Sequence, residues 1–128
     1  MALKVGDKIT LTRYRESKPG DLFVVMGTKA GKGTNVEWGS PVEVTETSFN
    51  YIAQAPNPET PPTKRLEYYV KFLEYSDELV ANDAYGEFAN APYKDITAIG
   101  EKLPREKIRQ WITSPSTPAT RQGLYGLL

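Results

Sequence analysis

Cysteine and histidine are both absent from this sequence, and their absence removes several classes of function at the outset. Without cysteine, the chain cannot form a disulfide, a thiolate nucleophile or a cysteine-ligated metal site. Without histidine, it lacks the side chain most used for zinc binding and for general-base catalysis near neutral pH. We therefore expect no cofactor, no metal site and no enzymatic activity.

An excess of charge of either sign is also missing, because 16 Lys and Arg residues balance 16 Asp and Glu residues. No summed field would attract nucleic acid or an anionic bilayer, so we expect no nucleic-acid partner. No apolar run approaches the roughly 20 residues of a membrane span, which predicts a soluble chain without one. The compartment is left open, since a chain without cysteine tolerates oxidising and reducing surroundings alike.

The N-terminal part of the chain has the pattern of short strands. Residues 7–16 alternate imperfectly between apolar and polar side chains, and turn-forming residues follow at 17–21. The apolar run at 22–26 is typical of a strand buried on both faces. Valines and a tryptophan predict further strands near 36–38 and 42–44. We expect these three or four strands to form one small antiparallel sheet.

The pattern changes to helical spacing after Thr47. Ser48 is a candidate cap for a short helix through Ala55, and the three prolines within 57–62 predict a stiff linker. We therefore divide the chain into a small β region with a short terminal helix, residues 1–56, and a helical region, residues 57–128.

The helical region consists of short apolar-faced segments separated by prolines. Leu66, Tyr69, Val70 and Leu73 lie at i, i+3, i+4 and i+7, and Asp77 is a good N-cap for the next helix. Further helices are expected at 94–103 and from Pro104 to Pro115. Short helices with short connections predict antiparallel helical hairpins, so the expected fold class is α+β.

An eight-residue pattern occurs twice, 57 residues apart. Residues 57–64 and 114–121 both read x-Pro-x-Thr-Pro-x-Thr-basic, and Tyr68 corresponds to Tyr125 in the helix that follows. This spacing indicates an internal repeat. The alternative is that helix N-termini share such residues for general reasons.

Several segments resemble uncharacterised bacterial HEAT-repeat-like proteins in which a small β region precedes the helical pairs. The resemblance covers about residues 23–128 and rests on the segments 65–74, 81–89, 103–104 and 123–128, of which the Asn-Asp-Ala-Tyr-x-Glu-Phe-Ala segment at 82–89 is the most specific. It implies helix pairs stacked into a solenoid and an exported full-length protein with further repeats. It implies no activity and no cofactor.

The chain finishes on an apolar helix-like run, Gly123 to Leu128, with no polar residue after it. Such an end is typical of a piece whose next element would cover the leucines, and it predicts self-association through this C-terminal helix. The alternative is a terminal helix that docks into the core of a complete domain.

Two segments invite a catalytic interpretation. The glycine-rich run at 27–34 is one residue short of a phosphate-binding loop and lacks a hydroxyl residue directly after its lysine, so we favour a hairpin loop. Asp83 and Glu87 share one helical face and could serve carboxylate chemistry, such as sugar hydrolysis. The alternative for these acids is a solvated or structural role within a helix that Asp77 caps.

Eight tyrosines and two tryptophans are many for 128 residues. Tyr69, Tyr85, Phe88 and Trp111 have core spacing, whereas the tyrosines nearer loops, including Tyr51, are candidates for recognition because they offer rigid contact area. The predicted interaction surface comprises Tyr68, Tyr75, Tyr93, Leu124, Leu127 and Leu128.

The function expected from these observations is a non-catalytic scaffold that binds a protein or peptide on a helical-repeat surface. Two alternatives stay open. One is a carboxylate-based enzyme or sugar-processing domain, and the other is a purely structural domain of a larger assembly, in which another subunit covers the C-terminal leucines.

Overall fold

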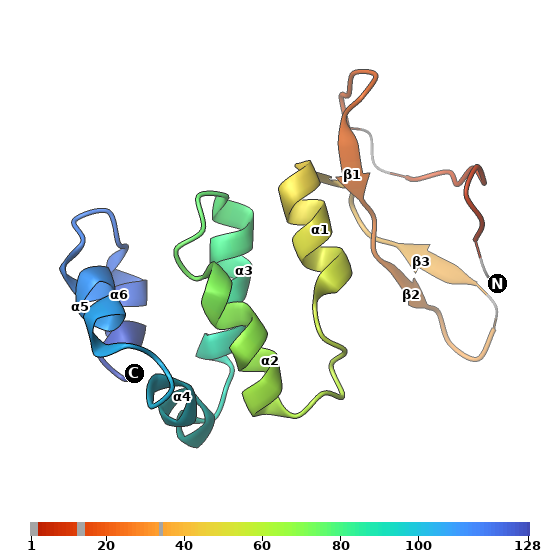
Figure 1. The fold of residues 1–128 in the computed structure, drawn as a ribbon. Coiled ribbons are helices and arrows are strands. Elements are labelled where there is room, and N and C mark those ends of the chain that lie inside the picture. The colour runs from red at the N-terminus through yellow and green to blue at the C-terminus, as the bar shows by residue number, and fades with distance from the viewer. Residues whose placement is uncertain (1–2, 13–14, 34) are drawn as a thin grey trace. The chain divides into compact units, whose positions relative to one another are not determined.

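The structure, a computed structural model, describes residues 3–12, 15–33 and 35–128. Four short strands come first and the helices follow, so the α+β class is confirmed (Figure 1). The elements are β1 (Leu22–Val24), β2 (Gly27–Lys29), β3 (Val36–Trp38), β4 (Val42–Val44), α1 (Glu46–Gln54), α2 (Pro62–Tyr69), the 3-10 helix η1 (Val70–Phe72), α3 (Glu78–Ala89), α4 (Tyr93–Gly100), α5 (Arg105–Thr113) and α6 (Ala119–Tyr125).

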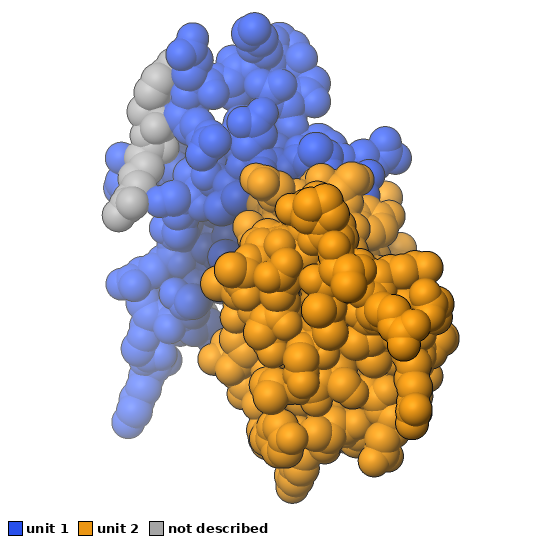
Figure 2. Space-filling view, turned by 90° about the vertical axis from the view of Figure 1, so that its left-hand side faces the viewer, with its two compact units in different colours: residues 1–49 blue, residues 50–128 orange. Residues whose placement is uncertain are grey.

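The chain divides into two compact units, coloured separately in Figure 2. Unit 1 comprises residues 1–49 and unit 2 comprises residues 50–128. The division falls inside α1, whereas the sequence placed its boundary at the start of the proline-rich linker, between residues 56 and 57.

Unit 1 contains two antiparallel pairs of strands and not the single sheet that the sequence predicted. Phe23 of β1 lies opposite Glu43 of β4, and Thr28 of β2 lies opposite Glu37 of β3. Each pair forms a separate two-stranded sheet. Each strand is only three residues long. β1 pairs with β4, and just two residues later β2 pairs with β3 instead.

Two strand predictions are wrong for the described residues. Between residues 7 and 16, no described residue lies in a strand, and Tyr14, part of that prediction, lies outside the described residues. The run at 22–26 is not buried on both faces, because Leu22 is 48% exposed and Met26 is 70% exposed. A two-stranded sheet has no second layer among the described residues of unit 1 to cover such a run.

Helix α1 begins three residues earlier than predicted, through a reciprocal cap. The backbone N–H of Ser48 donates to Thr45 Oγ1 (3.1 Å), and the backbone N–H of Thr45 donates to Ser48 Oγ (2.8 Å). Thr45 is therefore the N-cap. Ser48 is the third residue of the helix, and its side chain bonds back to the backbone of Thr45, so the prediction of Ser48 as the cap is wrong.

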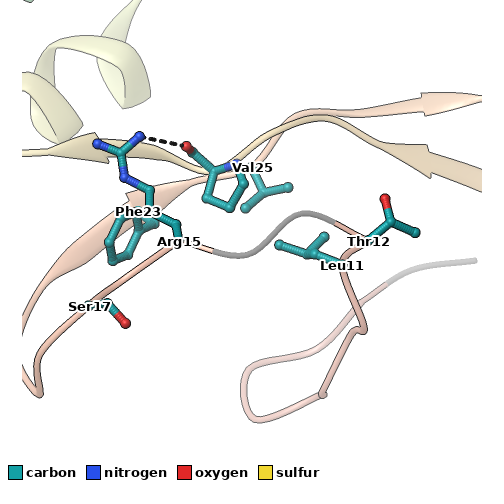
Figure 3. Close-up of a pocket in the computed structure, with 7 residues that line it drawn as sticks. Leu11, Thr12, Arg15, Ser17, Phe23 and Val25 are labelled. Carbon is teal, nitrogen blue, oxygen red and sulfur yellow. Dashed lines mark hydrogen bonds between the residues drawn. The ribbon is translucent and has the colours of Figure 1, made fainter.

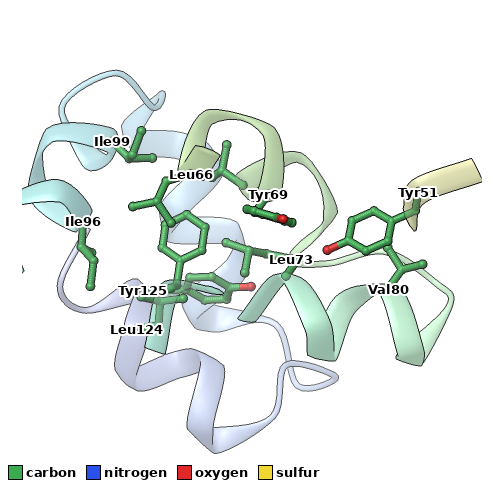
Figure 4. Close-up of a cluster of buried hydrophobic side chains, with 12 residues drawn as sticks. Tyr51, Leu66, Tyr69, Leu73, Val80, Ile96, Ile99, Leu124 and Tyr125 are labelled. Atoms are coloured by element: carbon green, nitrogen blue, oxygen red, sulfur yellow. The ribbon is translucent and has the colours of Figure 1, made fainter. Parts of the chain in front are cut away.

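Unit 2 is built around one hydrophobic core (Figure 4). The predicted helical face from Leu66 to Leu73 is confirmed, with Leu73 fully buried at its end. Helix α2 packs against both α3 and α4, and α6 packs against α5 and α3. The core residues are Tyr51, Leu66, Tyr69, Val70, Leu73, Val80, Ala84, Phe88, Ile96, Ile99, Leu124 and Tyr125.

Two kinds of residue start the helices of unit 2. Asp77 caps α3 as predicted, since its carboxylate accepts from the backbone N–H groups of Leu79 (3.0 Å) and Val80 (3.3 Å). Proline occupies the N-cap of the other four. Pro104, predicted as the first residue of its helix, is therefore the residue just before α5 begins. Proline suits this position because its fixed φ combines with an extended ψ. The capping prolines are Pro61, Pro92, Pro104 and Pro118.

Candidate functional site

The most distinctive surface feature of unit 2 is a chain of aromatic rings that runs from the core to solvent. Tyr51 is 4% exposed, and its ring centroid lies 4.9 Å from that of Phe72 and 5.8 Å from that of Tyr68. The Phe72 ring in turn lies 5.1 Å from Tyr68 and 5.2 Å from Tyr75. Tyr75, at the outer end, is 41% exposed. We call the half-buried and exposed members, Tyr68, Phe72 and Tyr75, the aromatic surface.

The backbone explains why these three rings meet. Helix α2 continues directly into η1, and the backbone N–H of Tyr75 donates to the carbonyl oxygen of Phe72 (3.1 Å) just beyond it. Positions 68, 72 and 75 are therefore i, i+4 and i+7 on one continuous winding and share a face. The opposite face carries Leu66 and Leu73 into the core. The rings are thus attached to a segment whose other face lies in the core.

Hydrogen bonds fix the inner rings. The Tyr68 hydroxyl donates to the carbonyl oxygen of Tyr51 (2.7 Å), and the Tyr51 hydroxyl donates to Asp83 Oδ2 (2.8 Å). Burial, and then the hydrogen bond to Asp83, raise the pKa of Tyr51 well above its usual value, and burial raises the pKa of Tyr68. Both hydroxyls consequently stay protonated as donors near neutral pH, and the aromatic surface has a rigid base.

Two lysines share the face of the aromatic surface. Lys64 and Lys71 lie four residues before and three residues after Tyr68, within the same arc of the helix. Among the described residues neither forms an ion pair, whereas the neighbouring Glu67 binds Lys102 Nζ. The pKa of Glu67 is lowered mainly by that bond to Lys102 and additionally by the charges of Lys64 and Lys71. The face therefore combines aromatic rings with two available positive charges.

The structure brings together only part of the predicted interaction surface. Tyr68 and Tyr75 are joined through Phe72, which the sequence analysis did not identify although its spacing from Tyr68 was a sufficient signal. Tyr93, at the start of α4, is 63% exposed and makes no ring contact among the described residues. Tyr51, considered for recognition from the sequence, is in the core.

The C-terminal leucines do not form one exposed face. Leu124 is 6% exposed and belongs to the core, so its place in a recognition surface was predicted wrongly. Leu127 is 46% exposed, and Leu128 is half-buried against the core cluster. The sequence indicated that these leucines lack a covering element. In the structure, the rest of unit 2 covers Leu124 and partly covers Leu128.

A polar contact holds α6 in place. Arg121 Nε donates to Glu74 Oε1 (3.0 Å), and the Tyr125 hydroxyl donates to the same carboxylate oxygen. The Trp111 ring lies 4.9 Å from the Tyr125 ring, between centroids. Burial and the bond to Glu74 raise the pKa of Tyr125 well above its usual value.

The two acids considered for catalysis have separate partners. Asp83 accepts from Tyr51, and Glu87 Oε2 accepts from Arg65 Nη2 (2.6 Å). The Arg65–Glu87 pair lines a cleft of about 250 Å³ whose other walls are mainly apolar, including Leu66. Within residues 3–12, 15–33 and 35–128, no three carboxylates gather closely enough to hold a metal ion.

Unit 1 offers an open groove of about 450 Å³ beside β1 (Figure 3). The Arg15 guanidinium lies 5.8 Å from the centroid of the Phe23 ring, donates to the carbonyl oxygen of Pro41 (3.4 Å) and pairs with Glu43 (3.5 Å). Its charge is therefore already engaged within unit 1. The glycine-rich run at 27–34 forms the β2–β3 hairpin in its described residues, as the sequence analysis favoured.

No helix in the described part of the chain combines the length and the apolar character that crossing a membrane requires. Comparison with protein-family models, curated proteins and solved structures gives no match to this chain.

Proposed function

We propose that unit 2 is a non-catalytic interaction module that binds a protein or peptide through the aromatic surface. The observation that carries this proposal is the unbroken series of ring contacts from buried Tyr51 to exposed Tyr75. Tyrosine and phenylalanine supply large contact areas with few rotatable bonds, so little conformational entropy is lost when they contact a partner. Anchoring in the core lowers that cost further.

We also propose that the helical region is HEAT-like. Support comes from its short helices, from the packing of α2 against α3 and of α5 against α6, and from the proline N-caps of α2, α4, α5 and α6. An arrangement of stacked pairs would place the aromatic surface on an extended face suited to peptide binding.

The carboxylate-enzyme alternative receives less support. Glycosidases need two facing carboxyl groups with different protonation, and metal-dependent hydrolysis needs converging acids. Asp83 and Glu87 are instead engaged by Tyr51 and Arg65. The structural alternative draws its support from exposed Leu127 alone.

An array of random peptides of about 12 residues, probed with the labelled protein, tests the proposed function. We expect a subset of peptides to bind the wild type and to lose at least about tenfold in affinity with Tyr75→Ser, as for an interface hot spot. Tyr93→Ser is the matched control, because it removes a second exposed tyrosine of unit 2 that makes no ring contact among the described residues. Equal binding by the wild type and Tyr75→Ser would contradict the proposal.

A further inference from the structure

The charges around the aromatic surface are unevenly distributed. Lys64 and Lys71 lie on its face without an ion-pair partner among the described residues, whereas the nearby acids Glu67 and Glu74 are bound to Lys102 and Arg121. Both lysines are exposed. The face that a partner would meet therefore presents two positive charges beside three rings, although the whole chain has a formal net charge of zero.

We infer that the partner of the aromatic surface is an acidic peptide segment that also carries apolar side chains. This inference rests on the proposed function and adds the charge of its partner. Apolar side chains of the peptide would contact Tyr68, Phe72 and Tyr75, and its carboxylates would lie near Lys64 and Lys71. Complementary charge of this kind raises the association rate and selects among partners that offer similar apolar contacts.

Nucleic acid also combines negative charge with groups that stack on rings, but the surface suits it less well. Binding a phosphate backbone relies on many cations along a groove, and each phosphate contact adds to the salt dependence. Here there are two unpaired lysines, and the pair Glu67–Lys102 lies beside them. Two cations are enough to favour an acidic peptide over a neutral one, but they make too few phosphate contacts to bind nucleic acid tightly.

Charge reversal tests the inference on the same peptide array. The wild type should prefer peptides rich in Asp and Glu. The double variant Lys64→Glu with Lys71→Glu should bind those peptides at least about tenfold more weakly, because attraction becomes repulsion. The control is Lys32→Glu with Lys94→Glu, which changes the net charge equally at exposed lysines elsewhere and should bind as the wild type does.

One selected acidic peptide, resynthesised, should lose affinity when the salt concentration rises from about 50 mM to about 300 mM. Its counterpart, with Asn and Gln replacing Asp and Glu, should bind weakly at both concentrations. An oligodeoxythymidine of about 12 nucleotides should not bind at about 150 mM salt. Binding of that oligonucleotide, lost on charge reversal, would overturn the inference in favour of nucleic acid.

The failure of this inference differs from failure of the proposed function. If peptides bind through Tyr75 without acidic preference and charge reversal has no effect, the inference about the partner is wrong and the interaction module remains. If no peptide distinguishes the wild type from Tyr75→Ser, both are wrong.

Discussion

Unit 1 is built from short strands and unit 2 from helices, and their interiors differ as much as their secondary structure. In the described part of unit 1, Val44 and Ser48 are the buried residues, whereas unit 2 encloses a core of twelve residues. The difference lies in how apolar side chains are spaced. In unit 2 they recur at helical spacing on several helices that face one another, and in unit 1 they lie on three-residue strands with one partner each. Forming hydrogen-bonded strands is therefore not sufficient to build a core.

The largest expected effect comes from emptying the core of unit 2. Phe88 is fully buried in α3, so Phe88→Ala should lower the free energy of unfolding by about 3–5 kcal/mol through lost burial and a residual cavity. The matched change in unit 1, Met26→Ala, removes a side chain that is 70% exposed and should cost less than about 0.5 kcal/mol. Urea unfolding measures both, followed by far-ultraviolet circular dichroism for unit 2 and by Trp38 fluorescence in a Trp111→Phe background for unit 1. Similar losses would contradict the comparison.

High pH should destabilise unit 2 through its buried tyrosines. The pKa values of Tyr51 and Tyr125 are raised by folding, so the stability they contribute is complete below the unfolded pKa of about 10 and is lost as the pH rises above it. The melting temperature should therefore fall from about pH 9.5 upward. Replacing both residues by Phe should flatten that decline, and Tyr93→Phe should leave it unchanged. An equally steep decline in the double variant would exclude these tyrosines as the cause.

Two helical glycines, Gly100 and Gly86, allow the effects of tight packing and of helix propensity to be measured separately. A Cβ atom added to Gly100 would clash with the backbone carbonyl oxygen of Leu128, so Gly100→Ala should displace Leu128 and cost about 1–3 kcal/mol. Gly86, in α3, has open space around it, and Gly86→Ala should stabilise by up to about 1 kcal/mol. Thermal melts of both variants test this, and a stabilising Gly100→Ala would show that the contact with Leu128 is not maintained.

The smallest expected effect is local to unit 1. A Cβ atom on Gly27 would lie 2.6 Å from Val36 Cγ1 and 2.8 Å from the Trp38 ring, so Gly27→Ala should move that ring and change its fluorescence. The midpoint of unfolding of unit 2, followed by circular dichroism, should stay the same. A Trp111→Phe background assigns the fluorescence to Trp38. A large shift of that midpoint would contradict the description of two separate units.

Helices were predicted well from this sequence because periodicity and capping are local signals. The face from Leu66 to Leu73 and the Asp77 cap both followed from spacing and side-chain chemistry, and the structure confirms them. The strands were predicted less well, because pairing partners come from distant residues. The run at 22–26 pairs for only three residues, and its burial depended on a second layer that the sequence could not reveal.

The repeated eight-residue pattern coincides with a local conformation that occurs at both copies. Thr60 and Thr117 each donate a turn hydrogen bond to the residue three positions earlier and precede a capping proline. Leu103 makes the same turn bond before Pro104 without the threonine pattern. Moreover, Tyr68 is half-buried and Tyr125 is in the core. The conformation therefore accounts for the pattern with or without an internal repeat, and the repeat stays a prediction.

The candidate site was only partly visible in the sequence. Tyr68 and Tyr75 were identified, but joining them required Phe72 and the continuation of α2 through η1. Leu124 was predicted to be exposed but is buried. The spacing of apolar residues identifies the apolar side of α6, but it does not show that α3 and α5 pack against this helix.

Native-state amide hydrogen exchange of the whole chain, followed by nuclear magnetic resonance, tests most directly whether unit 2 is a stable base for the aromatic surface. The account predicts that amides of α2 and α3, including those of Tyr69, Ala84 and Phe88, exchange only through global unfolding of unit 2. The paired amides of β1–β4 and β2–β3 should exchange orders of magnitude faster, through local unfolding. Equal protection in the two units, or rapid exchange throughout α2 and η1, would contradict it.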